Sequence, residues 1–300
     1  MKNHIVSLLL ASALALPSMA LADPARFDTL EEASAAFRNA LRSKGSDELL
    51  AVFGDDAADV LSSGDPVEDR ANRLALVLLA GEAMGLAPNN DGSVSITLGR
   101  DDWAFPIPLV LTEGAWSFDI AAGTEEINAR RIGRNELDVI ELLDAYVDIQ
   151  AEFRLNDHDG DGVMEFARHI ISDPDLRDGL VWAEPDSPMG VLLAQASLDG
   201  FNDGEEDRAP IPHSGYYFRI LTEQTAAAPG GERSYLMGGD MVAGHAILAV
   251  PAIYGETGRV SFMVSENGRI LEADLGPGTL DLVADWTAYD PTDQWGDVTD

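Results

Sequence analysis

Three aspartates in the middle of the chain are the residues whose spacing most clearly suggests chemistry. Asp157, Asp159 and Asp161 alternate along the sequence, so their carboxylates would repel one another unless water or a cation neutralises them. Gly162 provides a sharp turn directly after the third aspartate, and Val163 can offer its backbone carbonyl as a further oxygen ligand. Oxygen ligands at these spacings bind a hard cation of calcium's size, as in an EF-hand-type loop.

The loop departs from the EF-hand pattern at its closing ligand. The twelfth position, where a bidentate glutamate belongs, is Arg168, and the nearest substitute is Glu165 at the ninth position. We therefore predict a calcium site of modest affinity, near the ~10⁻⁴ to 10⁻³ M of extracellular calcium modules. Its predicted ligands are Asp157, Asp159, Asp161, Val163 and Glu165.

The predicted role of the ion is structural. It would fix the angle between a helix that ends near Arg154 and the segment that starts at Met164. The alternative interpretation is an aspartate-rich turn that joins two elements, with its carboxylates hydrated or capping helices.

The remaining polar candidates lack the pattern of a known catalytic site. Arg130, Arg131 and Arg134 form a basic island that would suit a carboxylate clamp, although internal ion pairing is the favoured interpretation. No two histidines have the spacing of His-Glu-x-x-His, and His158 and His169 beside the loop are expected to be exposed. A nucleophile elbow, a Walker lysine and a dinucleotide fingerprint are all missing, so no catalytic residue is predicted.

Composition excludes several classes of function. The 300 residues include 53 Asp and Glu against 19 Lys and Arg, a formal net charge of −34 at pH 7, so nucleic acid and anionic membranes would be repelled. The chain has no cysteine, which rules out disulfides, thiol nucleophiles and cysteine-ligated metals. The hydrophobic share of 46% is ordinary for a globular protein, so the chain can bury a core despite its charge.

The first 22 residues have the pattern of a cleavable secretory signal. Lys2 supplies the positive end, residues 5–16 are apolar, and Ala20 and Ala22 are the small residues that a signal peptidase requires. An apolar stretch of this length is too short to span a bilayer, which needs about 20 residues. We predict cleavage near Ala22 and Asp23, a periplasmic protein, and no membrane span after the signal is removed.

The elements that would position the loop fall into two predicted α+β domains, each with helices on a mainly antiparallel sheet. The first covers residues 23–123. A capping box at residues 28–31 would begin its first helix, and Gly85 would stop its second. The predicted elements are helices at 28–61, broken at 45–46, and at 66–84, and strands at 94–98, 105–111 and 115–119.

The second predicted domain, residues 124–300, follows a boundary at residues 121–123. Thr124 would cap a helix running to about Arg154, and the acidic tail after Asp290 is expected to be loosely held. The helix carries a core-facing stripe of Ile140, Leu143, Val147 and Gln150. The predicted strands are 216–222, 246–252, 260–264 and 270–274, with Asn267 and Gly268 as a hairpin turn.

Seven blocks in the same order give the chain a resemblance to a known family. They are SGDPV at 63–67, WAFPIPL at 103–109, RRIGRNEL at 130–137, DHDGDGVME at 157–165, GYYFRIL at 215–221, APGG at 228–231 and DLGP at 274–277. The sequence resembles the bacterial domain of unknown function 2950 family, which consists of exported proteins without an assigned activity. The resemblance covers nearly the whole mature chain and implies no catalytic residues.

Each half also has a weaker similarity. Residues 28–53 and 103–119 resemble small exported domains of the cystatin-like or nuclear-transport-factor-like kind, which implies helices against a curved antiparallel sheet. Residues 132–274 are similar to the globular domain of pilins and pseudopilins, which implies a helix, an acidic loop and an antiparallel sheet. Pilins join this domain directly to an apolar helix, whereas this chain has another domain in that place.

The functional expectation is a calcium-stabilised binding or envelope-associated module whose partner is an unknown envelope protein or polymer. Two alternatives stay open. One is a hydrolase that acts on an envelope polymer through carboxylates, and the other is a pilin-like interaction subunit. Because no catalytic motif is present, a binding module is preferred over an enzyme.

Overall fold

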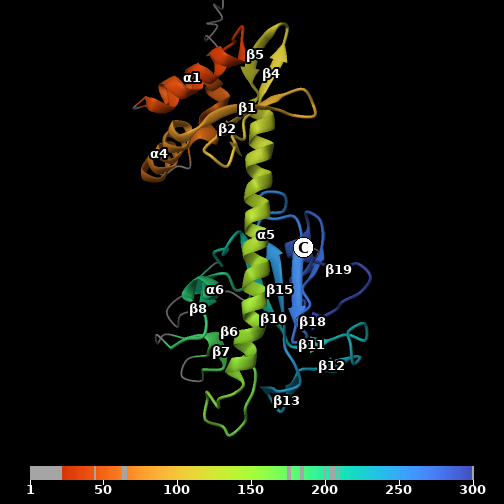
Figure 1. The fold of residues 1–300 in the computed structure, drawn as a ribbon. Helices are drawn as coiled ribbons and strands as arrows, with labels where there is room; N and C mark the ends of the chain where they lie inside the picture. The colour runs from red at the N-terminus through yellow and green to blue at the C-terminus, as the bar shows by residue number, and fades with distance from the viewer. Residues whose placement is uncertain are drawn as a thin grey trace, which may run out of the picture. The chain divides into compact units, whose positions relative to one another are not determined.

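A computed structural model describes residues 22–43, 45–62, 66–173, 177–182, 186–198, 201–202, 207–208 and 210–298 (Figure 1). The predicted signal sequence therefore lies outside the described residues, except for Ala22. The chain divides into two compact units, Met1–Ile127 and Asn128–Asp300. Each unit combines helices with a mainly antiparallel sheet, which confirms the α+β prediction.

The first unit opens with a helix whose start is fixed by a side-chain cap. Thr29 Oγ1 accepts a hydrogen bond from the Glu32 N–H (3.2 Å), and Glu32 Oε2 accepts one from the Asp28 N–H (3.1 Å). The helix is therefore capped by Thr29 and Glu32, one residue later than the predicted box, with the Glu32 carboxylate bonded to the residue before the N-cap. The helices are α1 (Leu30–Arg42), α2 (Asp47–Phe53), the 3₁₀ turn η1 (Asp55–Ala57), α3 (Ala58–Leu61) and α4 (Pro66–Glu82). The predicted break at residues 45–46 falls between α1 and α2.

An antiparallel sheet completes this unit. Its strands are β1 (Met84–Pro88), β2 (Val94–Leu98), β3 (Trp103–Ala104), β4 (Leu109–Thr112) and β5 (Ala115–Phe118), in the order β1-β2-β4-β5 with β3 beside β2. The prediction that Gly85 stops α4 is wrong. Gly85 lies in β1, where a Cβ would stand 2.7 Å from Thr97 Oγ1. Glu113 and Gly114 both have positive φ, at 54° and 84°, as the tight turn between β4 and β5 requires.

Four phenylalanines form the centre of the first core. The ring centroids of Phe37 and Phe105 are 4.6 Å apart, and those of Phe53 and Phe118 are 4.7 Å apart. Phe37 comes from α1, Phe53 from α2 and Phe118 from β5, so the rings join the helices to the sheet. Phe37 and Phe53 are completely buried.

The 34-residue helix α5 (Ile120–Phe153) begins earlier than predicted. Asp119 Oδ1 accepts a hydrogen bond from the Ala122 N–H (3.0 Å) and caps the helix, while the Thr124 hydroxyl donates to the Ile120 carbonyl (2.8 Å) inside its first turns. The helix continues without interruption through residues 121–123. Within the described part of the chain, no helix has an apolar stretch long enough to cross a membrane.

The second unit is organised by a five-stranded antiparallel sheet that lies alongside the C-terminal part of α5 (Figure 1). The strand order is β10 (Tyr216–Leu221), β15 (Ala246–Pro251), β16 (Ser261–Ser265), β17 (Leu271–Ala273) and β19 (Gly296–Asp297). Val139, Leu143 and Tyr146 of α5 are fully buried in the same core as β15 and β16. The predicted hairpin turn is confirmed, with Gly268 at φ 72°.

The acidic tail is held more firmly than predicted. Its strand β19 pairs with β17, Trp295 is 8% exposed, and Asp297 forms an ion pair with Arg269. The charge of the tail suggested a solvated end, but a buried tryptophan and a ladder pairing fix it to the sheet.

Short elements complete the second unit. The parallel pair is β6 (His169–Ile171) and β7 (Gly179–Val181), and the antiparallel pairs are β8 (Phe201–Asn202) with β9 (Asp207–Arg208), and β13 (Leu236–Met237) with β14 (Asp240–Met241). A three-stranded sheet contains β11 (Glu223–Gln224), β12 (Arg233–Ser234) and β18 (Ala288–Tyr289). The remaining described helices are α6 (Val191–Gln195) and α7 (Thr279–Leu282).

The phenylalanine core gives a stability prediction. Phe37→Ala should lower the free energy of unfolding by about 3–5 kcal/mol, because it leaves a cavity among the other three rings. Leu74→Ala on α4 is the control, because Leu74 is 59% exposed and its truncation should change stability by about 0.5 kcal/mol or less. Urea unfolding monitored by circular dichroism measures both, and equal effects would contradict the described core.

Candidate metal-binding loop

The aspartate-rich loop connects the end of α5 to the segment that leads into β6. Gly160 and Gly162 have φ values of 80° and 93°, a region that side chains with a Cβ rarely adopt. A Cβ at either glycine would meet no atom within 4 Å, so the backbone conformation and not crowding requires glycine. These two turns fold the loop back so that alternate side chains face one another.

The structure brings the three predicted aspartates together. One carboxylate oxygen from each of Asp157, Asp159 and Asp161 lies within 4.8 Å of the other two, and all three side chains are exposed. Asp157 accepts hydrogen bonds from two backbone N–H groups, at Gly160 (2.7 Å to Oδ1) and Gly162 (3.0 Å to Oδ2). The other two each accept one, from the N–H two residues ahead. Backbone dipoles therefore compensate part of the repulsion among the three carboxylates.

Asp157 remains anionic in this setting. Desolvation pushes its pKa upward, but the N–H groups of Gly160 and Gly162 stabilise the carboxylate, and the net pKa lies below the ordinary value. The loop thus keeps a concentrated negative charge at neutral pH, which is the electrostatic requirement for holding a cation.

His158 was predicted to be exposed beside the loop, but it is half-buried against α5. Its ring stacks on Phe153 with centroids 4.1 Å apart, and its Nε2 is 3.0 Å from the Phe153 carbonyl oxygen. The Trp182 ring lies 5.6 Å from the His158 ring. This contact anchors the first turn of the loop to the C-terminal end of the helix.

Glu165 lies at the other end of the loop and is only 8% exposed. Its Oε2 accepts a hydrogen bond from the Met241 N–H (2.8 Å), and the Phe166 N–H donates to the Met241 carbonyl (2.9 Å). Burial raises its pKa, as do the charges of Asp159 and Asp240, while the Met241 N–H opposes the shift. One oxygen of Glu165 is therefore engaged with β14. Val163 is half-buried, and its N–H donates to Asp161 Oδ1 (2.7 Å).

Arg168, at the position of the missing glutamate, has a separate partner. Its Nε and Nη2 both donate to Asp178 Oδ2, at 2.9 and 2.6 Å, and its Nη1 donates to the Gly239 carbonyl (3.2 Å). The Asp178 side chain is 1% exposed. The ion pair joins the segment after the loop to the start of β7 and to the turn before β14.

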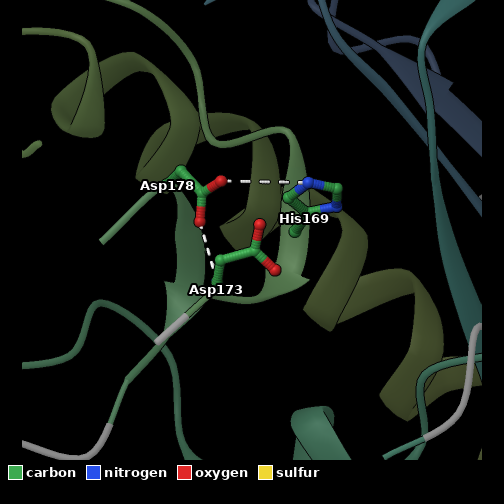
Figure 2. A group of neighbouring side chains, drawn as sticks. All are labelled: His169, Asp173 and Asp178. Atoms are coloured by element: carbon green, nitrogen blue, oxygen red, sulfur yellow. Dashed lines mark hydrogen bonds and ion pairs between the residues drawn. The ribbon is translucent and has the colours of Figure 1, made fainter. Parts of the chain in front are cut away.

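A second group of possible ligands surrounds the same aspartate (Figure 2). His169, Asp173 and Asp178 each place one ligand atom within 4.8 Å of the other two, and His169 Nε2 is 3.8 Å from Asp178 Oδ2. However, both Asp178 oxygens already accept N–H donors, Oδ2 from Arg168 and Oδ1 from the Asp173 backbone (2.9 Å). A cation would have to displace the guanidinium, so this group is better described as an ion-pair anchor.

Gln150 is the residue that sequence reasoning missed most clearly, because its place in the predicted core stripe concealed a polar role. It is fully buried, its Oε1 accepts from the Ala167 N–H (2.9 Å), and its Nε2 donates to the Ala167 carbonyl (2.9 Å). Its Nε2 also donates to the Tyr146 hydroxyl (3.2 Å), which in turn donates to the Ala246 carbonyl (3.2 Å). The segment after the loop is thereby fixed to α5.

The basic island is partly integrated into the second unit. Arg131 Nε donates to the Glu256 carbonyl (3.2 Å), and the amides of Asn128 and Asn135 donate to the carbonyls of Gly255 and Thr257. Arg131 therefore holds a loop carbonyl, which differs from the carboxylate pairing expected for it.

The fold and the loop define the class of the protein, an α+β protein of two compact units with an aspartate-rich loop at the end of a 34-residue helix. The family model of the protein of unknown function DUF2950 matches residues 25–298, and the chain belongs to that family. No curated protein and no solved structure matches the chain. Because a family of unknown function supplies no activity, function has to be argued from the site itself.

Glu165 provides a test of the loop electrostatics in the absence of metal. Because its folded-state pKa is raised, the charged carboxylate opposes folding at neutral pH, and stability increases as the pH falls toward that pKa. Glu165→Gln keeps an acceptor for the Met241 N–H and removes the charge, so in chelator at pH 7 it should raise the free energy of unfolding by about 1 kcal/mol or less. A clear loss of stability in urea unfolding would contradict this description.

Proposed function

We propose that this protein is an exported, periplasmic binding module of the cell envelope whose second unit is stabilised by calcium. The observation that carries the proposal is the convergence of the Asp157, Asp159 and Asp161 oxygens within 4.8 Å of one another. The loop turns at glycines and is anchored at both ends, by His158 to α5 and by Glu165 to β14. Such a loop positions oxygen ligands before the ion arrives.

Calcium would act by neutralising three adjacent carboxylates and adding Val163 and Glu165 as further ligands. In that arrangement the ion joins the end of α5 to the segment that pairs with β14. With Arg168 committed to Asp178, the twelfth position contributes no ligand, which suits the ~10⁻⁴ to 10⁻³ M range of extracellular calcium modules.

An exposed apolar face on α4 supports a binding role. Leu74 and Leu78 are four residues apart, on the same side of the helix, and are 59% and 62% exposed. Two neighbouring apolar side chains therefore reach solvent on this side of the helix, where an apolar surface of a partner could cover them. The partner we propose is an envelope protein or polymer.

A hydrolase is the less supported alternative. General acid catalysis at neutral pH calls for a carboxyl group with a raised pKa beside a second, ionised one. Glu165 has a raised pKa, but its carboxylate is hydrogen-bonded to the Met241 backbone inside the loop. The pilin-like subunit is distinguished by assembly: filaments would support it, and a monomer would favour the binding module.

Calorimetric melting with and without calcium tests the proposal. At a calcium concentration about 100 times Kd, binding should add ~2.7 kcal/mol to the free energy of unfolding and raise the melting temperature by several degrees. Asp159→Ala should abolish this increase and leave the melting temperature in chelator nearly unchanged, because Asp159 accepts only the Asp161 N–H, at 3.2 Å.

Two further variants make the calcium test specific. Asp157→Ala should lower the melting temperature in chelator as well, because it removes the acceptor for the Gly160 and Gly162 N–H groups. Asp101→Ala, an exposed aspartate in a turn of the first unit, should leave the calcium response intact. Equal losses for Asp159→Ala in calcium and in chelator would reject the metal role.

Processing tests the export part of the proposal. The periplasmic form should begin at Asp23, because Ala20 and Ala22 occupy the positions that signal peptidase reads. Ala20→Arg should accumulate the precursor, and Ala11→Gly, outside the cleavage site, should not. N-terminal sequencing of the two forms measures both, and unprocessed protein in the periplasm would contradict the assignment.

A further inference from the structure

A buried histidine lies where the segment after the loop packs against the core of the second unit. His245 is 1% exposed and immediately precedes β15. Its ring centroid is 4.6 Å from that of Phe166, which belongs to the segment, and 5.3 Å from that of Tyr146 on α5. The imidazole therefore contacts α5 through Tyr146 and the irregular segment after the loop through Phe166.

The polar atom of this ring that is turned inward has no partner. Nδ1 of His245 is buried and makes no hydrogen bond with the described part of the chain. The charged groups around it do not favour a positive ring. Arg154, in the turn directly after α5, places its guanidinium 4.5 Å from the centroid of the Phe166 ring, and its positive charge acts on His245.

Of the other charged or titratable neighbours, Tyr146 and Glu266 do not change this balance. Glu165, in the segment itself, has a raised pKa, so protonation of its carboxylate favours the closed segment and acts against the effect of His245. Tyr146 stays neutral, because burial raises the pKa of its hydroxyl far above its usual range. Glu266, in the turn after β16, donates its backbone N–H to the His245 carbonyl (3.2 Å), while its carboxylate forms an ion pair with Arg233 (3.8 Å). An imidazolium here would need an acceptor for Nδ1–H and would find none.

We propose that His245 is a proton-operated latch: when its imidazole takes up a proton, the segment at residues 164–168 separates from the core and admits water to the ring. Opening on the Phe166 side is the least costly route, because Tyr146 belongs to the long helix and His245 leads directly into a central strand. The segment has no helix or ladder of its own and is held by the Gln150, Met241 and Asp178 contacts. The latch does not depend on calcium.

The direction of the pH dependence follows from the environment of the ring. Burial, reinforced by the charge of Arg154, lowers the pKa of His245 to about 4, below the ordinary 6.5. The closed state is therefore fully favoured above pH 6.5 and loses stability as the pH falls from there toward 4.

Hydrogen exchange of the full mature chain in chelator tests the latch. After correction for intrinsic exchange, the Phe166 and Ala167 amides should open roughly 50- to 100-fold more often at pH 4.5 than at pH 7. The opening frequency of the Leu248 and Met263 amides, in the ladder of β15 and β16, should not increase comparably. His245→Phe, which keeps an aromatic ring without a proton site, should remove the gain, and the control His213→Gln should retain it.

Two results would overturn the proposal. One is that His245→Phe and a second variant, His245→Gln, both keep the wild-type increase in Phe166 and Ala167 opening at pH 4.5. The other is an equal gain at Leu248 and Met263, which would mean global acid unfolding. If neither variant folds, nuclear magnetic resonance titration of the wild-type imidazole decides, because a ring that titrates at its ordinary value without opening excludes the latch.

Discussion

The packing of one face of α5 against the central sheet is the interaction on which the second unit depends. Val139, Leu143, Tyr146 and Gln150 are completely buried along this face. The face supplies hydrophobic contact near its middle and a hydrogen-bonded amide near its end, so the helix both stabilises the sheet and fixes the segment at residues 164–168. Gln150 is the polar residue of this face, and a buried amide without partners would destabilise the fold. Its three hydrogen bonds satisfy the amide and fix where the segment after the loop lies.

The acidic loop and His245 are both attached to this face. The acidic loop begins where α5 ends, with His158 stacked on Phe153, and its far end is held by Glu165 and by the Gln150 amide. His245 packs on Tyr146 from the same helix. A short irregular segment thus lies between a site of concentrated negative charge and a buried neutral base. The position of this segment depends on both sites. Glu165 closes the acidic loop against Met241, and the next residue, Phe166, packs on the ring of His245.

The sequence predicted the parts of this arrangement that are local. The alternation of Asp157, Asp159 and Asp161, with glycines between and after them, indicated converging oxygens. The strands predicted at residues 216–222, 246–252, 260–264 and 270–274 correspond to β10, β15, β16 and β17. It did not reveal contacts between distant residues. The pairing of Glu165 with Met241 spans 76 residues, and the contact of Phe166 with His245 has no periodic signature. The helix start was misplaced because Asp119 and Thr124 are both plausible caps, and only the backbone path distinguishes them.

The short strand β19 has a consequence for how the sheet meets other chains. It covers part of the outer edge of β17, which would otherwise present unpaired N–H and C=O groups to solvent. The Arg269–Asp297 ion pair and the buried Trp295 keep it there. Shortening or tagging the polypeptide at the β19 end would expose the edge of β17 to strand pairing with another molecule. Aggregation of such variants would then result from the exposed strand edge and not from a damaged core.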